Sequence, residues 1–190
     1  MKREDALDIV NEFVSNQNLL RHMLAVEAAM EDYAGIYGED PEEWGILGLL
    51  HDFDWEIHPT MDSHPQDGAP ILLEKGVPES IIRAILSHAD HTGVPRESRM
   101  EQALFACDEI TGLITAVALV RPSRSVHDVK VKSVKKKWKD QRFAANVNRE
   151  DIERGAEELG VDLWEHVGRV IHSMQRIAPD LGLEGTNSSP

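Results

Sequence analysis

Residues 40–52 read DPEEWGILGLLHD, a stretch that combines a strong helix signal with two side chains able to bind a metal ion. Asp40 is a favourable N-cap residue, Pro41 fits the first helical turn, and the two acids that follow suit the positive end of the helix dipole. The rest of the stretch is mostly apolar, which favours a buried helix from Pro41 to His51. The helix ends where His51 and Asp52 stand side by side.

The remainder of the chain also has helical character. Leu7, Val10 and Val14 recur at intervals of three and four residues, the spacing of one helix face. No run of alternating β-branched and aromatic residues indicates a strand. The sequence therefore predicts an all-α protein with about nine helices. Their approximate ranges are residues 7–14, 19–33, 41–51, 65–75, 78–88, 99–120, 126–140, 149–159 and 162–177.

Composition excludes several classes of function. The 190 residues include 20 Lys and Arg against 34 Asp and Glu, a formal net charge of −14. This charge disfavours wrapping of nucleic acid or binding to an anionic membrane, because both need a positive surface. The single cysteine, Cys107, rules out a disulfide framework and a cysteine-based zinc site. The N-terminus lacks the apolar segment of a signal peptide, and the longest apolar stretch, residues 112–120, is too short to span a bilayer, so we expect a cytoplasmic protein.

Six residues that can bind a metal ion lie on the predicted helices or near their ends. Imidazole and carboxylate ligands together suit a divalent transition metal such as Mn, Fe, Co, Ni or Zn, whereas Mg prefers oxygen ligands. In chain order, the six residues are His22, His51, Asp52, His64, His88 and Asp108.

The local sequence gives physical reasons to single out four of these residues. Neighbours on a helix point about 100° apart, but at a frayed helix end His51 and Asp52 can face one target. The two carboxylate oxygens of Asp52 could then serve two metal ions. His22 lies on an apolar helix face and Asp108 follows an apolar run, where an unpaired charge is costly. A metal ion would offset that cost, and so would a buried His–Asp hydrogen bond without metal.

This ordered set resembles the motif of the HD-domain superfamily of metal-dependent phosphohydrolases, over residues 18–118. The resemblance implies that His22, His51, Asp52 and Asp108 hold one metal ion.

A second metal ion is implied by a further resemblance. His64-Pro65, followed by Gly68-Ala69 and later by His88, is similar to the two extra histidines of the two-metal branches of the superfamily. In those branches Asp52, His64 and His88 would hold the second ion.

The resemblance also suggests domain boundaries and argues against two branches of the superfamily. It implies a helical HD-domain bundle with its core at residues 1–120. Beyond it, the helical pattern predicts additional C-terminal helices at residues 121–181 packed on the same domain, and the composition of residues 182–190 predicts a flexible tail. The sequence Gly93-Val94-Pro95 replaces the Gly-Tyr-Pro of the cyclic-di-GMP phosphodiesterases, which argues against that branch. Nor does a Glu-Asp pair directly follow the His-Asp doublet, as it does in the alarmone hydrolases. The chain looks most like small bacterial HD-domain hydrolases of unassigned substrate.

Other candidate site residues follow from their positions in the chain. Asp54 and Glu56 come just after the doublet, so either could orient the attacking water or protonate the leaving oxygen, or both could belong to a solvated acidic loop. His91 is a candidate for substrate binding because it lies three residues after a predicted ligand. Arg121 and Arg124 open a basic stretch, residues 121–142, with nine of the 20 basic residues. That stretch could form a positive lip that attracts a phosphorylated substrate, or simply a solvated helix face.

Together these features predict a metal-dependent phosphohydrolase with one or two divalent transition metal ions. It would cleave a phosphate ester or anhydride of a nucleotide or small phosphorylated metabolite with a metal-activated water. We expect no membrane partner and no nucleic-acid partner. Two alternatives stay open: an HD-type di-iron oxygenase, since a few members of the superfamily use an iron pair to oxidise a substrate, and a non-catalytic regulatory module that binds metal.

Overall fold

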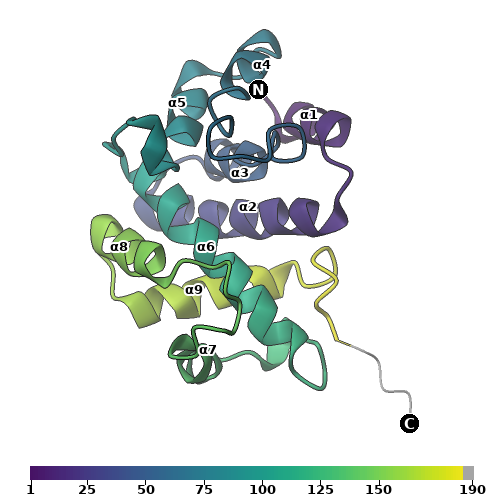
Figure 1. The fold of residues 1–190 in the computed structure, drawn as a ribbon, viewed down its shortest axis with the longest axis vertical. Helices are drawn as coiled ribbons and strands as arrows, with labels where there is room; N and C mark the ends of the chain where they lie inside the picture. Colours follow the sequence, from purple (N-terminus) through teal and green to yellow (C-terminus); the bar gives the residue numbers. More distant parts are fainter. Residues whose placement is uncertain (186–190) are drawn as a thin grey trace.

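A computed structural model of the chain describes residues 1–185. Over these residues it contains nine α-helices, two short 3-10 helices and no β-sheet (Figure 1), which confirms the predicted all-α class. The elements are α1 (Arg3–Phe13), α2 (Gln17–Tyr37), α3 (Pro41–Leu50), α4 (Ala69–Glu74), α5 (Glu79–Ser87), η1 (Asp90–Thr92), α6 (Arg99–Leu119), η2 (Val126–Asp128), α7 (Val131–Trp138), α8 (Arg149–Leu159) and α9 (Leu163–Arg176).

Capping residues fix the starts of α2, which carries His22, and of α3, which leads to the His51-Asp52 doublet. The side chains of Asn16 and Asp40 accept hydrogen bonds from backbone N–H groups at the starts of α2 and α3. α2 runs past residue 33, where its predicted range ends, and continues to Tyr37. It ends at Gly38, whose φ of 74° lies in the left-handed region that favours glycine.

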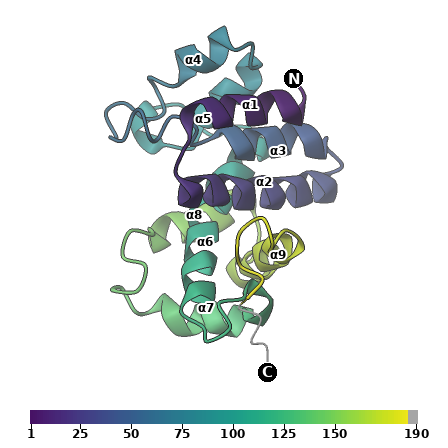
Figure 2. The same ribbon diagram turned by 90° about the vertical axis from the view of Figure 1, so that its right-hand side faces the viewer.

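The helices are arranged on two sides of α2, and α6 crosses α2 to contact both groups (Figures 1 and 2). On one side α3 packs on α2, α1 packs on α3, and α5 contacts α3, α4 and α6. On the other side α8 and α9 pack against α6 and against each other, and α9 also contacts α2. The C-terminal helices therefore share the core of the N-terminal part.

A close approach of α3 to α2 fixes the part of α3 that carries the doublet. A Cβ atom at Gly48 would lie 2.8 Å from the backbone of Glu27 on α2, so only glycine fits there without a shift. Gly48 comes three residues before His51. The contact thereby places the end of α3 against the helix that carries His22.

Helix α6 is, among the described residues, the one helix long and apolar enough to cross a membrane by length and composition. Most of its apolar window is buried inside the protein, where it contacts α2, α5, α8 and α9. Its apolar side chains form the centre of the core, and Leu104, Ile110 and Leu113 are fully buried. We therefore interpret its apolarity as that of a core helix.

The C-terminal part differs from the sequence-based expectation in two places. Residues 126–140 do not form one helix, because the chain turns between η2 and α7 and thereby buries both Val126 and Val129. Residues 182–185 are not a free tail, since Leu183 is buried and its carbonyl accepts a 2.9 Å hydrogen bond from the Val126 backbone. The rest of the predicted tail, residues 186–190, lies outside the described residues.

Candidate metal centre

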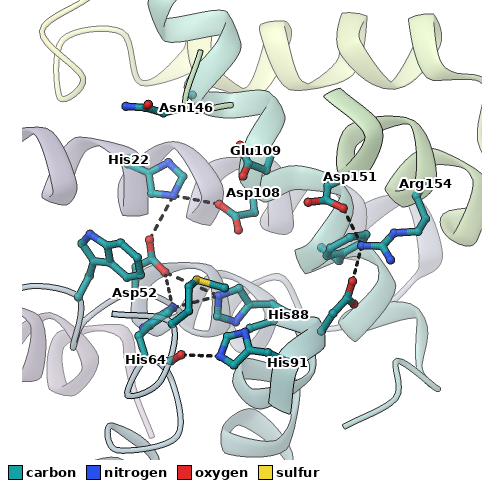
Figure 3. A pocket seen from close by; sticks show the side chains of 16 residues that line it. His22, Asp52, His64, His88, His91, Asp108, Glu109, Asn146, Asp151 and Arg154 are labelled. Carbon is teal, nitrogen blue, oxygen red and sulfur yellow. Dashed lines mark hydrogen bonds and ion pairs between the residues drawn. The ribbon is translucent and has the colours of Figure 1, made fainter. Parts of the chain in front are cut away.

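The structure brings all six predicted metal ligands together beside the crossing of α2 and α6. Figure 3 shows five of them, all except His51. Two of the ligands lie within helices α2 and α6, and the other four lie at or just beyond helix ends or in the turns before α4. The ligands are His22 from α2, His51 and Asp52 from the end of α3, His64 from the turns before α4, His88 from the end of α5, and Asp108 from α6.

One half of the centre is formed by His22, His51 and Asp108. The Nε2 atoms of His22 and His51 lie 3.2 Å apart. Asp108 Oδ1 lies 3.1 Å from the first of these nitrogens and 3.6 Å from the second. Three donor atoms thus surround one point, the arrangement expected of ligands to a single ion.

The other half is formed by His64, His88 and Asp52. The Nε2 atoms of His64 and His88 lie 3.3 Å apart, and Asp52 Oδ1 lies 3.3 Å and 3.8 Å from them. The second oxygen, Oδ2, lies 3.6 Å and 3.5 Å from the Nε2 atoms of His22 and His51. Asp52 therefore directs one carboxylate oxygen to each half.

These spacings fit divalent metal ions. A zinc–nitrogen bond of about 2.0–2.1 Å places two nitrogen ligands of one ion about 2.9–3.4 Å apart, for ligand angles between about 90° and 109°. Both pairs of Nε2 atoms, at 3.2 Å and 3.3 Å, fall within that range. The donor set of imidazoles and carboxylates also suits several transition metals.

Backbone carbonyl groups fix two of the imidazole rings. His51 donates from Nδ1 to the Gly48 carbonyl at 2.8 Å, and His88 donates from Nδ1 to the carbonyl of Ile85. Because Nδ1 carries the proton in both neutral rings, the lone pair is on Nε2 and faces the centre. Both bonds reach back three residues, so the ends of α3 and α5 themselves orient these rings.

Side chains fix the other two rings. His64 donates from Nδ1 to Asp54 Oδ1 at 2.8 Å. Thr111 donates its hydroxyl proton to the Asp108 carbonyl at 2.8 Å, so its oxygen is free to accept from His22 Nδ1 at 3.1 Å. All four imidazoles therefore present an Nε2 lone pair to the centre. Such an arrangement is unfavourable unless a cation occupies the space between the lone pairs.

The charges in the centre favour a cation. Burial alone would lower the pKa of His51, but the carboxylates of Asp52 and Asp108 outweigh burial and raise that pKa to about 9. Burial is similarly outweighed at His64, where Asp52 and Asp54 raise the pKa to about 9. Burial would raise the pKa of Asp52, yet the neighbouring His51 and His64 hold it well below its usual range. The carboxylates of the centre thus favour positive charge beside His51 and His64, which a metal ion would also supply.

The centre opens into a cleft with a volume of about 610 Å³, a size that suits a small-molecule ligand. Figure 3 shows the ligands on one side of this cleft and an arginine with two carboxylates on another. Besides five of the six ligands, the cleft is lined by Trp55, Met61, Ala89, Asp90, His91, Phe105, Glu109, Gly112, Asn146, Asp151 and Arg154.

The two residues predicted as catalytic groups beyond the ligands do not face the cleft. Asp54 is fully buried and binds the Nδ1 side of His64, opposite the nitrogen that faces the centre. Its position makes it an orienting group for His64. Glu56 points to the surface, where it accepts hydrogen bonds from the backbone of Ser15 and Asn16 and from the Ser15 hydroxyl. It connects the loop to the start of α2, because the turns after Asp52 direct it away from the site.

His91, which was predicted to bind substrate, does line the cleft. Its Nε2 donates a 2.8 Å hydrogen bond to the carbonyl of His64 and also lies 3.2 Å from Gln66 Oε1. The ring thus supports the loop that carries a ligand, at the rim of the site.

Arg121 and Arg124, the other predicted substrate-binding residues, lie elsewhere. They follow the C-terminal end of α6, and the helix from Asp108 to its end at Leu119 is about 17 Å long at 1.5 Å per residue. Arg121 donates to the hydroxyl of Ser133, and neither arginine lines the cleft. Their positions do not support the prediction, which took closeness in sequence to α6 as closeness to the site.

Several residues of the site were not predicted, one behind the ligands and four that line the cleft. Thr111 lies one helical turn after the aspartate ligand of α6, so the i, i+3 spacing was a usable signal. Glu109 also lies on α6, where burial and the neighbouring aspartate raise its pKa to about 7. Asn146, Asp151 and Arg154 come from the loop before α8 and from α8 itself. Only the packing of α8 on α6 brings these three to the cleft, and no motif marks them.

Comparison with known proteins identifies the family. Residues 19–112, about half of the chain, match the family model described as HD domain, and the match includes all six ligands of the centre. No curated protein and no solved structure gives a match. Together with the helical fold and the His/Asp clusters that could hold metal, the match indicates a metal-dependent function of the hydrolase type. The chain therefore belongs to the HD-domain superfamily.

Proposed function

We propose that the protein is a phosphohydrolase that cleaves a phosphate ester or anhydride of a small metabolite at a two-metal centre. The observation that supports this most strongly is the position of Asp52, whose two oxygens face two separate pairs of imidazole nitrogens. A shared carboxylate suits two ions about 3.5–4 Å apart, the spacing used by many enzymes that transfer phosphoryl groups.

Each ligand has a place in this proposal. His22, His51 and Asp108 would hold one ion, His64 and His88 the other, and Asp52 both. When bound, divalent ions supply a water of lowered pKa and withdraw charge from the oxygens of the phosphoryl group.

The chain contributes rigidity and shielding. The hydrogen bonds that the four ligand imidazoles donate from Nδ1 hold the rings in place before metal or substrate arrives, which is what precise positioning of a reacting group requires. The Trp55 ring packs edge-on against the His64 ring, with 4.9 Å between their centroids, and lines the cleft. It therefore shields one ligand from water on the side of the cleft.

The test is a screen for phosphate release from monoesters, diesters and nucleotide anhydrides, with Mn, Co, Ni, Fe or Zn added. We expect wild-type protein to release phosphate only with metal, and the Asp52→Ala variant to lose that activity. Asp67→Ala is a matched control, because Asp67 is exposed and lies outside the cleft. Absence of release from every substrate with every metal would refute the proposal. In that case oxygen consumption by iron-loaded protein would favour the oxygenase alternative, and metal binding alone would favour a regulatory module.

A further inference from the structure

The wall of the cleft away from the metal ligands is built largely by α8 and the loop before it. Asn146 precedes α8, and Asp151 and Arg154 belong to α8, which lies outside the part of the chain that matches the HD domain. Asp90 completes this wall from the 3-10 helix that follows His88. The part of the wall formed by Asn146, Asp151 and Arg154 therefore lies outside the matched segment, whereas Asp90 lies within it.

Close packing holds α8 in this position. A Cβ atom at Gly155 would lie 2.7 Å from the Cα atom of Ala106 on α6, so the two helices approach as closely as glycine permits. Asp151 and Arg154 are three residues apart on α8 and therefore share one face. That face is turned to the cleft, as Figure 3 shows.

Arg154 is held by two carboxylates. Its Nη2 lies 2.5 Å from Asp90 Oδ2 and 2.7 Å from Asp151 Oδ1. Its guanidinium also lies 4.8 Å from the centroid of the Phe105 ring, against which Arg96 packs at 3.8 Å. The charge of Arg154 is thus already matched, and its position is fixed.

This pairing determines the charge that a ligand meets. Arg154 is the only Lys or Arg among the described residues that line the cleft, whereas Asp90, Glu109 and Asp151 line the same part. Asp90 also pairs with Arg96 at 2.9 Å, yet these three carboxylates still outnumber the two arginines. A second phosphate placed there would therefore meet net negative charge. Hydroxyl groups, in contrast, can donate hydrogen bonds to carboxylates and to the Asn146 amide oxygen.

We propose that this wall selects phosphomonoesters with one phosphate and a hydroxyl-bearing organic part, through Arg154 held between Asp90 and Asp151. The inference rests on the proposed function, because it places the phosphate at the metal ligands and leaves the organic part to contact the wall.

The test compares two probes, glucose 6-phosphate and glucose 1,6-bisphosphate, on protein loaded with Mn²⁺. Kd values are measured by titration calorimetry, and phosphate release is followed in a separate assay. We expect wild-type protein to bind the monophosphate at least about ten-fold more tightly, since the net negative charge of this wall repels the second phosphate. Asp151→Asn should narrow this ratio about five- to ten-fold, because it frees the charge of Arg154.

Two further variants complete the test. Asp151 also accepts a hydrogen bond from Asn148 at the start of α8, so Asp90→Asn serves as a second variant with the same expected direction. Glu153→Gln removes one charge from an exposed position on α8 outside the cleft and should keep the wild-type ratio.

Tighter binding of the bisphosphate by wild-type protein, or no binding of either probe, would overturn the inference. So would an unchanged ratio in both aspartate variants, because it would show that Arg154 is not restrained by its partners. These outcomes depend on binding alone. Selective binding without any phosphate release would therefore sustain the selectivity and count against the proposed hydrolysis.

Discussion

Replacement of Asp54 by asparagine tests whether this carboxylate orients the metal ligand His64 or takes part in catalysis. Asp54 is fully buried, and its Oδ1 accepts the 2.8 Å hydrogen bond from His64 Nδ1. Asparagine fills the same space and keeps an oxygen acceptor, but it removes the negative charge that makes His64 a stronger ligand. Loss of such an outer partner typically weakens metal binding 10- to 100-fold, or about 1.4–2.7 kcal/mol.

The loss should fall on one half of the centre. Asp54 contacts His64 and does not contact His22, His51 or Asp108, so Asp54→Asn should weaken the ion held by His64 and His88 and leave the other ion in place. Calorimetric titration of metal-free protein with Mn²⁺ or Zn²⁺ should show two binding steps in wild-type protein and a selective weakening of one step in the variant. Urea unfolding of the metal-free variant should stay cooperative with a loss of about 1–3 kcal/mol, because His64 loses a charged acceptor and the new amide nitrogen is buried without a partner.

Glu56→Gln is the matched control, because it removes the same charge two residues further along the loop. Glu56 caps the start of α2 from the surface, so both binding steps should keep their wild-type affinity. The reasoning would be refuted if Asp54→Asn bound both ions with wild-type affinity, or if it weakened both equally.

Two other predictions concern the core and the basic stretch. Burial lowers the pKa of His166 to about 4, below its value of about 6.5 in the unfolded chain. The unfolded chain therefore takes up this proton first, so the stability due to neutral His166 is complete above about pH 6.5 and declines by about 3 kcal/mol as the pH falls to about 4. An NMR titration of the His166 ring with a midpoint near 6.5 would disprove this. Charge reversal by Arg121→Glu with Arg124→Glu should leave KM for any substrate that is turned over unchanged at low and at high salt, and a salt-dependent rise in KM would restore these arginines to the site.

The helices could be predicted because their signals are local. Asp40 at an N-cap, Pro41 in the first turn and apolar residues at helical spacing are all properties of a short stretch, and α3 begins where they indicate. The break between η2 and α7 could not be predicted from residues 126–140, because the local composition favours a helix throughout. The break arises from the burial of Val126 and Val129 in the tertiary core.

The ligand side chains could be singled out because each is chemically unusual in its local sequence. Asp108 stands in an apolar run and His51-Asp52 at a helix end, so residue type and position indicate the same role. The direction of Asp54 could not be derived, since it depends on how the turns after α3 pack against Gly68, whose Cβ would lie 2.5 Å from Asp54 Oδ2. The α8 residues in the cleft could not be predicted either, because only the packing of α8 on α6, a contact between distant parts of the chain, brings them there.

The two-metal centre is the central claim, and anomalous X-ray diffraction tests it most directly. Crystals of protein purified without chelator and supplied with Mn²⁺ or Zn²⁺ should show two anomalous peaks about 3.5–4 Å apart, one on each side of the Asp52 carboxylate. One peak should lie between His22, His51 and Asp108 and the other between His64 and His88. A single peak, or peaks remote from these side chains, would contradict the account.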